Sequence, residues 1–290
     1  MTEPLKLRLR RKPILLAPGV YDALTASLAT SAGAEAIYLS GAAIAYTRLG
    51  RPDIGLVAMT EVVDTISLIR DRVATPLIVD ADNGYGNALN MQRTVRMFER
   101  AGAHAVQIED QSYPKRCGHL DGKQLVSAAE MVGKIRAAVD ARTSSDTLII
   151  ARTDAIAVEG FRSAIERAHL YAQAGADVLF VEAPGSKVEM AKLTAELGAN
   201  LPLMANMVEG GKTPVLGAAE LEALGFALVI FPGGIVRAIA HAARDFYATL
   251  ARDGTSAAFR NRMYDFETLN DIIGTPEMLA LGKSYGDATT

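Results

Sequence analysis

Eight short apolar segments recur along this 290-residue chain, and they constrain its fold more than any other feature. Within each segment the apolar residues are continuous rather than alternating, which is typical of parallel strands buried on both faces. Helical patterns such as "NMQRTVRMFERAG" and "SAIERAHLYAQAG" lie between them. The segments are "PILLAPG" (13–19), "AIYLSG" (36–41), "PLIVDAD" (76–82), "AVQIED" (105–110), "LIIARTD" (148–154), "VLFVEA" (178–183), "PLMANM" (202–207) and "LVIFP" (228–232). Eight strands that alternate with helices predict an α/β fold, a closed (β/α)8 barrel of the TIM type.

A weak internal repeat supports the barrel. The stretches "SAGAEAIYLS", "RAGAHAVQIED", "QAGADVLFVEA" and "ALGFALVIFP" each run from a helix end through a glycine into a buried strand. We expect Gly33, Gly102, Gly175 and Gly225 to adopt the left-handed conformation that closes a helix. A doubly wound dinucleotide-binding sheet shares this alternation, but no G-x-G-x-x-G follows an early strand, and eight units exceed one half-sheet.

The sequence predicts one domain. We assign residues 1–290 to a single (β/α)8 barrel domain in which residues 252–290 form a C-terminal helical extension. This extension lies beyond the eighth unit and carries both polar and apolar helical sequence. We expect it to cap the barrel or to pack on another subunit.

Composition narrows the classes of partner. The formal net charge is −3, and the only basic run, within residues 6–12, is interpreted as a solvated segment rather than a nucleic-acid-binding arm. A single cysteine cannot form an internal disulfide, which favours a reducing compartment. No apolar stretch approaches the roughly 20 residues that span a bilayer, and no signal peptide is recognised. We therefore expect a cytoplasmic protein with no nucleic-acid or membrane partner.

Polar residues end every predicted strand except the first and the last. In a barrel of this kind the chemistry lies at the carboxyl ends of the strands, so these side chains are expected to share one mouth. A role in solubility alone would scatter them over the helices instead. They are Tyr38, Ser40, Gly41, Asp80, Asp82, Glu109, Asp110, Arg152, Thr153, Asp154, Glu182 and Asn206.

The acids of this set predict a divalent cation site. Asp80 and Asp82 are separated by two positions and would share one face of a strand, with Glu109 on the next strand and Asp53 in a preceding loop. Crowded carboxylates raise one another's pKa, and a hard cation such as Mg²⁺, with Mn²⁺ as an alternative, relieves the repulsion. The alternative interpretation makes these acids loop caps or partners of Arg152. A zinc site is not indicated, because the four histidines are scattered.

Two further features favour an anionic substrate and a proton transfer. Arg152 is a planar fork suited to a carboxylate, although it can equally pair with Glu182. Ser40 with the amides of Gly41 and Ala42 can bind an anionic oxygen, or form a plain turn. The only cysteine, Cys117, lies in the loop "YPKRCGHLDGK" beside Lys115, Arg116 and His119, which would favour its thiolate. Such a thiol can be a nucleophile or a proton carrier, and we favour proton transfer under a closing loop because no partner for a Cys–His dyad is evident.

Five ordered motifs resemble one known superfamily. "YLSG", "VDADNGYGN", "IEDQ…PKRCGH", "IARTDA" and "ANMVEGGKTP" are together similar to the isocitrate lyase/phosphoenolpyruvate mutase superfamily over roughly residues 13–260. The resemblance implies a Mg²⁺-dependent modified barrel, a homotetramer with a helix exchanged between subunits, and action on small 2-hydroxy or 2-oxo carboxylates.

The resemblance also implies roles for particular residues. Asp80 would be the direct metal ligand, with Asp53, Asp82 and Glu109 acting largely through water. Cys117 would protonate the carbanion released on cleavage, on a catalytic loop that includes Lys115 and His119, and Tyr38 would help to move the hydroxyl proton. The substrate-binding residues would be Ser40, Gly41, Ala42, Arg152, Glu182, Asn206 and Thr213.

The implied activity is a carbon–carbon lyase that cleaves a substituted malate, similar to 2,3-dimethylmalate, by retro-aldol scission to a 2-oxo acid such as pyruvate and a carboxylate. Alternatives are 2-methylisocitrate cleavage, carboxyphosphonoenolpyruvate phosphonomutase activity, oxaloacetate decarboxylation or hydrolysis, and a catalytically idle barrel. The segment "FPGGIVRA" departs from the "YPLS" type common in the family and removes a serine hydroxyl expected near the distal end of the substrate. That departure favours a smaller or more apolar malate over a tricarboxylate. The glycine pairs Gly210-Gly211 and Gly233-Gly234 follow strands seven and eight, where barrels often hold phosphate, and keep the mutase open.

Overall fold

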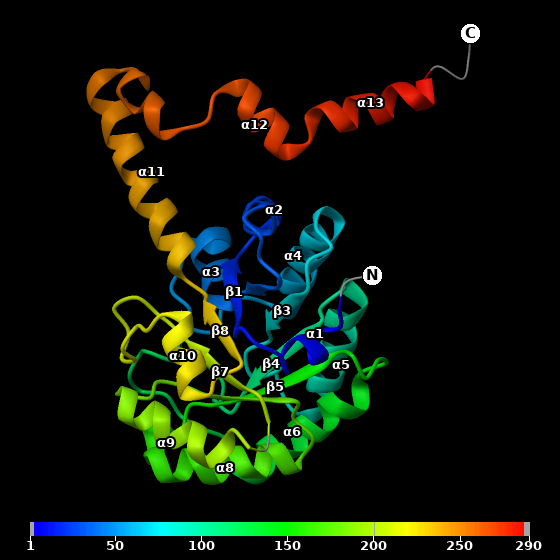
Figure 1. Ribbon diagram of the computed structural model, residues 1–290, viewed down its shortest axis with the longest axis vertical. Helices are drawn as coiled ribbons and strands as arrows, with labels where there is room; N and C mark the ends of the chain where they lie inside the picture. The colour runs from blue at the N-terminus through cyan, green and yellow to red at the C-terminus, as the bar shows by residue number, and fades with distance from the viewer. Residues whose placement is uncertain (1–2, 200, 287–290) are drawn as a thin grey trace. The chain divides into compact units, whose positions relative to one another are not determined.

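The predicted barrel is confirmed. A computed structural model describes residues 3–199 and 201–286, in which eight parallel strands close into a barrel in sequence order, β1 pairing with both β2 and β8 (Figure 1). Every strand falls within the apolar segment that predicted it, except that β1 extends one residue further, to Val20. The strands are β1 (Leu15–Val20), β2 (Ile37–Leu39), β3 (Leu77–Asp80), β4 (Ala105–Glu109), β5 (Leu148–Thr153), β6 (Val178–Val181), β7 (Leu203–Asn206) and β8 (Leu228–Phe231).

Helices connect the strands, with local signals at their ends. Asp22 accepts a hydrogen bond from the Thr25 N–H at the start of α2, and Asn87 caps α5 in the same way. Three of the predicted closing glycines, at 102, 175 and 225, have φ of 104–105°, and Gly33 has φ of 90°. The helical segments of the barrel are α1 (Leu5–Arg8), α2 (Ala23–Ser31), α3 (Gly41–Ile44), η1 (Ala45–Leu49), α4 (Met59–Arg72), α5 (Ala88–Ala101), α6 (Ala128–Ala141), α7 (Ile156–Glu159), α8 (Phe161–Gln173), α9 (Lys187–Leu197) and α10 (Ala218–Leu224).

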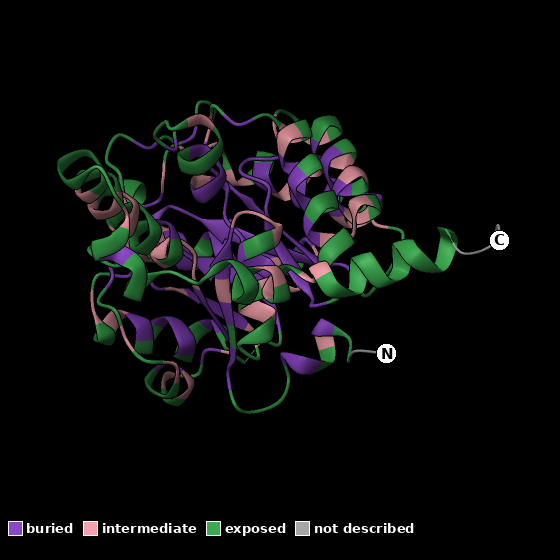
Figure 2. Cartoon of the chain, turned by 90° about the horizontal axis from the view of Figure 1, so that it is seen from above, coloured by how far each residue is buried: buried purple, intermediate pink, exposed green. Residues whose placement is uncertain are grey.

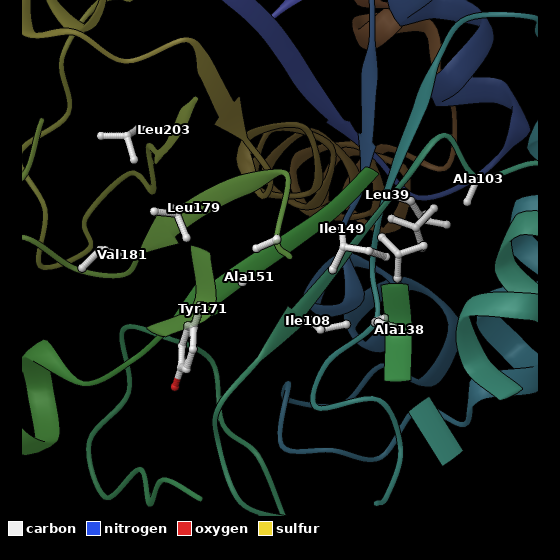
Figure 3. Packing of buried hydrophobic residues seen from close by; sticks show 14 of the residues in the cluster. Leu39, Ala103, Ile108, Ala138, Ile149, Ala151, Tyr171, Leu179, Val181 and Leu203 are labelled. Atoms are coloured by element: carbon white, nitrogen blue, oxygen red, sulfur yellow. The ribbon is translucent and has the colours of Figure 1, made fainter. Parts of the chain in front are cut away.

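The core has two layers because side chains alternate across each strand. Ile149 and Leu179 point outward and belong to the apolar layer between strands and helices, part of which is drawn in Figure 3. Their neighbours Ile150 and Phe180 belong to a separate cluster that fills the barrel itself. Figure 2 shows the strands as the continuously buried centre, with exposed residues on the outer helices. The inward layer matters for function because its last members, at the carboxyl ends of the strands, are polar.

The chain forms two compact units, residues 1–236 and 237–290. Helix α11 (Gly234–Asp253) begins at the end of the first unit, and the second contains the rest of it together with η2 (Ala257–Arg262), α12 (Phe266–Ile273) and α13 (Thr275–Gly286). Neither α12 nor α13 has a buried residue, and Phe266 is 88% exposed. The single domain with an extension from residue 252, and the helix exchange between subunits, stay predictions. Among the described helices, none combines the length and apolar character that a membrane crossing requires.

Candidate active site

Strand alternation places the predicted polar residues inside one end of the barrel. On β4, Ala105 belongs to the interior cluster, so Gln107 and Glu109 at two-residue steps also face inward. The same step from Ile150 reaches Arg152, and from Phe180 it reaches Glu182. These side chains are nearly inaccessible to solvent, Glu109 at 1% and Arg152 at 7%. The predicted convergence of polar side chains therefore holds for these residues. It is wrong for Thr153 and Asp110, which face α8 because they alternate with inward residues: Asp110 Oδ2 accepts from the hydroxyls of Thr153 and Tyr171, each at 2.7 Å.

Asp80, the last residue of β3, is held in a fixed orientation. The Tyr38 hydroxyl donates to Gln107 Oε1 at 2.7 Å, and Gln107 Nε2 donates to Asp80 Oδ1 at 3.1 Å. The second oxygen, Oδ2, accepts from the Gly41 N–H at 3.4 Å. Burial, with Asp80 as the nearest charge, raises the pKa of Tyr38 well above its usual value. Tyr38 therefore keeps its proton and orients Gln107, which does not suit the predicted part in moving a substrate proton.

Asp82 lies at the mouth of the barrel, but not on the strand face that was expected to bring it there. Strand β3 ends at Asp80, and Asp82 has φ of 48°, so the two residues do not share a strand face. Instead the Asp82 N–H donates to Asp80 Oδ1 at 3.1 Å, which turns the chain back on itself. Both carboxylates then lie beside Gly41, where an added Cβ would stand 3.2 Å from Asp80 Oδ2 and 3.3 Å from Asp82 Oδ1. The left-handed conformation costs on the order of 1–3 kcal/mol at a non-glycine residue, and such strain concentrates at functional sites.

Lys115 lies among the acids. Its Nζ is 2.5 Å from Asp53 Oδ1 and 2.7 Å from Asp82 Oδ1, with its side chain 5% exposed. Burial raises the pKa of Asp82 to about 7 although Lys115 opposes the shift, and burial likewise raises the pKa of Glu109 well above its usual range. Lys115 is therefore engaged with the acid cluster rather than with the thiol of Cys117.

The donor set fits a hard cation held partly through water. Glu109 Oε1 is buried and has no hydrogen-bond partner among the described residues. Burial raises the pKa values of Asp82 and Glu109, and a cation beside them would stabilise their charged forms. In the described part of the chain no three His, Cys, Asp or Glu side chains stand close enough to enclose an ion by themselves. A site with Asp80 as the direct ligand and the other acids behind water accommodates both observations.

Arg152 is the cationic centre of the mouth. Its guanidinium binds Asp154 through Nε at 2.8 Å and Nη2 at 3.0 Å. Nη1 lies 3.4 Å from Glu109 Oε2, and Nη2 lies 3.5 Å from Glu182 Oε2. The Phe180 ring lies 5.2 Å from the guanidinium carbon. The predicted ion pair with Glu182 is thus present, at a longer distance than the bidentate pair with Asp154.

The loop that carries Cys117 folds over this cluster. The Cys117 N–H donates to the Asp53 carbonyl at 3.2 Å, and the Leu120 N–H donates to the Cys117 carbonyl at 2.9 Å. Burial raises the pKa of the Cys117 thiol, and Asp53 adds to the rise. The prediction that neighbouring bases favour the thiolate is therefore wrong for this conformation, because Lys115 pairs with acids instead. A neutral thiol suits a proton donor better than a nucleophile.

His119 joins the Cys117 loop to the segment after β7. Its Nδ1 accepts from the Lys212 N–H at 3.0 Å, and its Nε2 lies 3.4 Å from Glu182 Oε1. Burial lowers the pKa of His119, which favours the neutral ring that this acceptor role requires. Asn206 Nδ2 donates to Glu182 Oε2 at 3.0 Å. His119, Glu182 and Asn206, three of the residues that the sequence predicts for the site, therefore form one contact set.

The remaining predicted residues lie at the start of α3 and in the segment between β7 and α10. Ser40 caps α3, accepting from the Ala43 N–H at 3.2 Å, so the turn interpretation of Ser40 holds. The N–H groups of Gly41 and Ala42 lie in the first turn of this helix, where intrahelical acceptors are missing. The Gly41 N–H donates to Asp80 Oδ2, which leaves the Ala42 N–H as the donor that can bind an anionic oxygen. Thr213 is 4% exposed, and its hydroxyl has no hydrogen-bond partner among the described residues.

Sequence reasoning missed two residues. Gln107 is fully buried and links Tyr38 to Asp80; its signal was a lone amide two positions before Glu109 in an apolar strand. Lys123 lies in the loop, its Nζ 2.8 Å from Asp154 Oδ1. No periodicity marks Lys123, because its partner is brought to it by the fold.

Comparisons with known proteins show the family of the chain. Residues 5–251 match the family described as phosphoenolpyruvate phosphomutase. The chain is 42% identical over 277 residues to 2,3-dimethylmalate lyase of Eubacterium barkeri, covering 96% of this chain and 95% of the relative. It is 46% identical over 266 residues to 2-methylisocitrate lyase of Aeropyrum pernix, covering 92% and 85%.

Solved structures are similar over nearly the whole chain. One is oxaloacetate acetylhydrolase in complex with 3,3-difluorooxalacetate, at a TM-score of 0.93 and 33% identity, covering 100% of this chain and 98% of the other. Another is a phosphonopyruvate hydrolase complex with oxalate and Mg²⁺, at a TM-score of 0.88 and 30% identity, covering 98% and 99%. The solved structures that are similar to this chain therefore belong to enzymes with different activities.

Proposed function

The chain belongs to the phosphoenolpyruvate mutase/isocitrate lyase superfamily, and on that basis we propose that it is a lyase that cleaves the C2–C3 bond of a substituted malate, of the 2,3-dimethylmalate type. One observation carries the proposal beyond the family. The neutral thiol of Cys117 is held on a loop that folds over Arg152 and the acid cluster, where a carbanion released by cleavage needs a proton. A carbon–carbon lyase uses such an acid to protonate the carbanion that cleavage releases.

Each group of residues has a part in the proposed reaction. Arg152 and the Ala42 N–H bind the carboxylate and 2-oxygen of the substrate. Asp80 would hold Mg²⁺ or Mn²⁺ directly, and Asp53, Asp82 and Glu109 would hold it through water. When bound, the ion supplies Lewis-acid polarisation of the 2-oxygen. As C2–C3 breaks, a carboxylate of the acid cluster accepts the hydroxyl proton, and Cys117 Sγ donates its proton to C3 of the departing carboxylate fragment. Proton exchange with water after product release restores the carboxylate and the thiol.

The segment after β8 supports a small or apolar distal group. By family resemblance this segment lies near the distal end of the substrate, and here it reads Pro232-Gly233-Gly234. A Cβ at Gly234 would stand 2.8 Å from Glu209 Oε1, so a carboxylate, not a hydroxyl, borders this position. The serine hydroxyl that the family commonly places at this position is missing here, which favours a dimethylmalate-type substrate over methylisocitrate.

The test is release of a 2-oxo acid from a panel of malates in the presence and absence of Mg²⁺, followed with lactate dehydrogenase and NADH. We expect turnover of 2,3-dimethylmalate, lost on removal of the metal, and little from 2-methylisocitrate. Oxalate formed from oxaloacetate, or a phosphonate detected by ³¹P NMR, would replace the proposal with hydrolase or mutase activity.

We also propose that the protein is a homotetramer in the cytoplasm. The exposed apolar residues of α12 and α13, Phe266, Met278 and Leu279 among them, support packing of these helices on another subunit. Light scattering on the purified protein tests the assembly, and a monomer would contradict it.

A further inference from the structure

Lys123 is a buried cation to which the proposed chemistry gives no part. Its side chain is 1% exposed, and its Nζ donates to the Gly118 carbonyl and, at 2.8 Å, to Asp154 Oδ1. A buried ammonium is costly unless it is paired and hydrogen-bonded, and Lys123 satisfies both conditions with one loop carbonyl and one strand-end carboxylate. The side chain therefore ties a point within the Cys117 loop to the end of β5.

The carboxylate that Lys123 binds is also the main partner of Arg152. Arg152 Nε donates to Asp154 Oδ2 at 2.8 Å, and Nη2 donates to Oδ1 at 3.0 Å. The Asp154 N–H donates to Asp110 Oδ1 at 2.9 Å, which fixes Asp154 at the strand end. One immobilised carboxylate thus connects the loop to the guanidinium that binds substrate in the proposed function.

The carbonyl that Lys123 binds belongs to the residue next to Cys117. Gly118 rests on Arg152 and Glu182 so closely that a Cβ would come within 3.0 Å of both side chains. Holding the Gly118 carbonyl therefore fixes the Gly118–His119 peptide, which begins one residue after Cys117. Without Lys123, the loop would keep the bond from the Cys117 N–H to the Asp53 carbonyl and the bond between His119 and Lys212, but it would lose the bond that holds the Gly118 carbonyl.

We propose that Lys123 is a positioning residue that holds the Cys117 loop down on Arg152 through Asp154, so that the thiol stands over the bound substrate. The proposal rests on the proposed function for its catalytic meaning, because there Cys117 supplies the proton. Lys123 touches neither the substrate nor the reacting atoms. Its effect is on how often the loop is closed.

Alkylation of Cys117 by iodoacetamide reads out loop position without any assumed activity, because Cys117 is the only cysteine in the chain. For Lys123→Met, which retains bulk without charge, we expect alkylation about tenfold or more faster, kcat about tenfold or more lower, and KM within about twofold. A fold-change of this size corresponds to loss of a hydrogen bond to a charged group. Loss of a nearby positive charge alone would disfavour the thiolate and slow alkylation, so faster alkylation reports an opened loop.

The chain offers a matched control. Arg142 Nη1 donates to the Thr147 carbonyl, five residues away, at 2.9 Å and to Asp177 Oδ2 at 2.6 Å, which is the same bonding pattern before the amino ends of β5 and β6. Arg142→Met should leave both the alkylation rate and kcat at wild-type values. Circular dichroism and thermal unfolding establish that each variant is folded.

The outcomes separate this inference from the proposed function. If a folded Lys123→Met protein alkylates at the wild-type rate, the positioning role is wrong even where lyase activity is found. If the wild type releases no 2-oxo acid, the proposed function fails, and the alkylation comparison still decides the role of Lys123. Should Lys123→Met not fold, Lys123→Gln, which keeps hydrogen-bond donors, is judged by the same comparison and is expected to react faster than wild type.

Discussion

Replacing Gly118 with alanine is predicted to lift the Cys117 loop away from the strand ends. An added Cβ would stand 2.7 Å from Glu182 Cγ and 2.8 Å from Glu182 Cδ, and closer still to Arg152 Nη2. Neither neighbour has room to retreat, since Glu182 is 1% and Arg152 7% exposed, and Arg152 is held by both oxygens of Asp154. The loop must therefore move instead of the site.

The size of the effect follows from the packing. Inserting one methyl group into a well-packed region costs about 1–3 kcal/mol. Because about 1.4 kcal/mol corresponds to a factor of ten, the closed loop becomes about 5- to 150-fold less populated. Since a surface loop takes up the strain by opening, we expect kcat/KM to fall by that factor while the midpoint of thermal unfolding changes little.

The assay is kcat/KM for 2-oxo acid release, measured beside thermal unfolding. Gly133→Ala is the control, because Gly133 lies in α6 and no heavy atom outside its own helix turn comes within 4 Å of an added Cβ. That variant should keep wild-type kcat/KM and gain about 0.5–1 kcal/mol of stability. Wild-type kcat/KM in Gly118→Ala would refute the steric reasoning.

Three other changes give further tests. Cys117→Ser should abolish turnover and leave Mg²⁺ binding by calorimetry near normal; an active variant would exclude Cys117 as the acid. Gln107→Met removes the N–H that orients Asp80 and should weaken Mg²⁺ binding about tenfold or more, whereas unchanged affinity would exclude the Gln107 link. Burial alone would raise the pKa of Asp154, but Arg152 and Lys123 lower it to about 2. The contribution of the Asp154 carboxylate to the free energy of unfolding is therefore full above about pH 4 and is lost as pH falls through 2. In urea unfolding, Asp154→Asn should lower the free energy of unfolding by about 2 kcal/mol at pH 7, and the difference between wild type and variant should narrow between pH 4 and 2.

The barrel could be predicted because its strands are buried on both faces. Continuous apolar runs, closing glycines and polar strand ends are local properties of the sequence, and each is present in the structure. The inward direction of Glu109 and Arg152 needed the structure, because a continuous apolar run does not show which of its residues face the interior; one interior neighbour then fixes the two-residue period.

The contacts of the loops could not be predicted in the same way. Asp82 was placed on a strand face, but it lies past the strand end in a left-handed conformation. Lys115 was assigned to the thiol, but it pairs with Asp53 and Asp82. These positions depend on which distant groups the fold brings together, and no period in the sequence records that.

The site has more buried carboxylates than buried cations, and this imbalance lowers the stability of the folded protein. Six buried carboxylates meet three buried cations, Lys115, Lys123 and Arg152, at the mouth; the acids are Asp53, Asp80, Asp82, Glu109, Asp154 and Glu182. The cations are distributed unevenly, because Lys123 and Arg152 both bind Asp154 while Asp82 and Glu109 have raised pKa values. A core built for stability alone would have used apolar residues here. A divalent cation held by Asp80 would stabilise the charged forms of Asp82 and Glu109, whereas Lys123 and Arg152 are bound to Asp154.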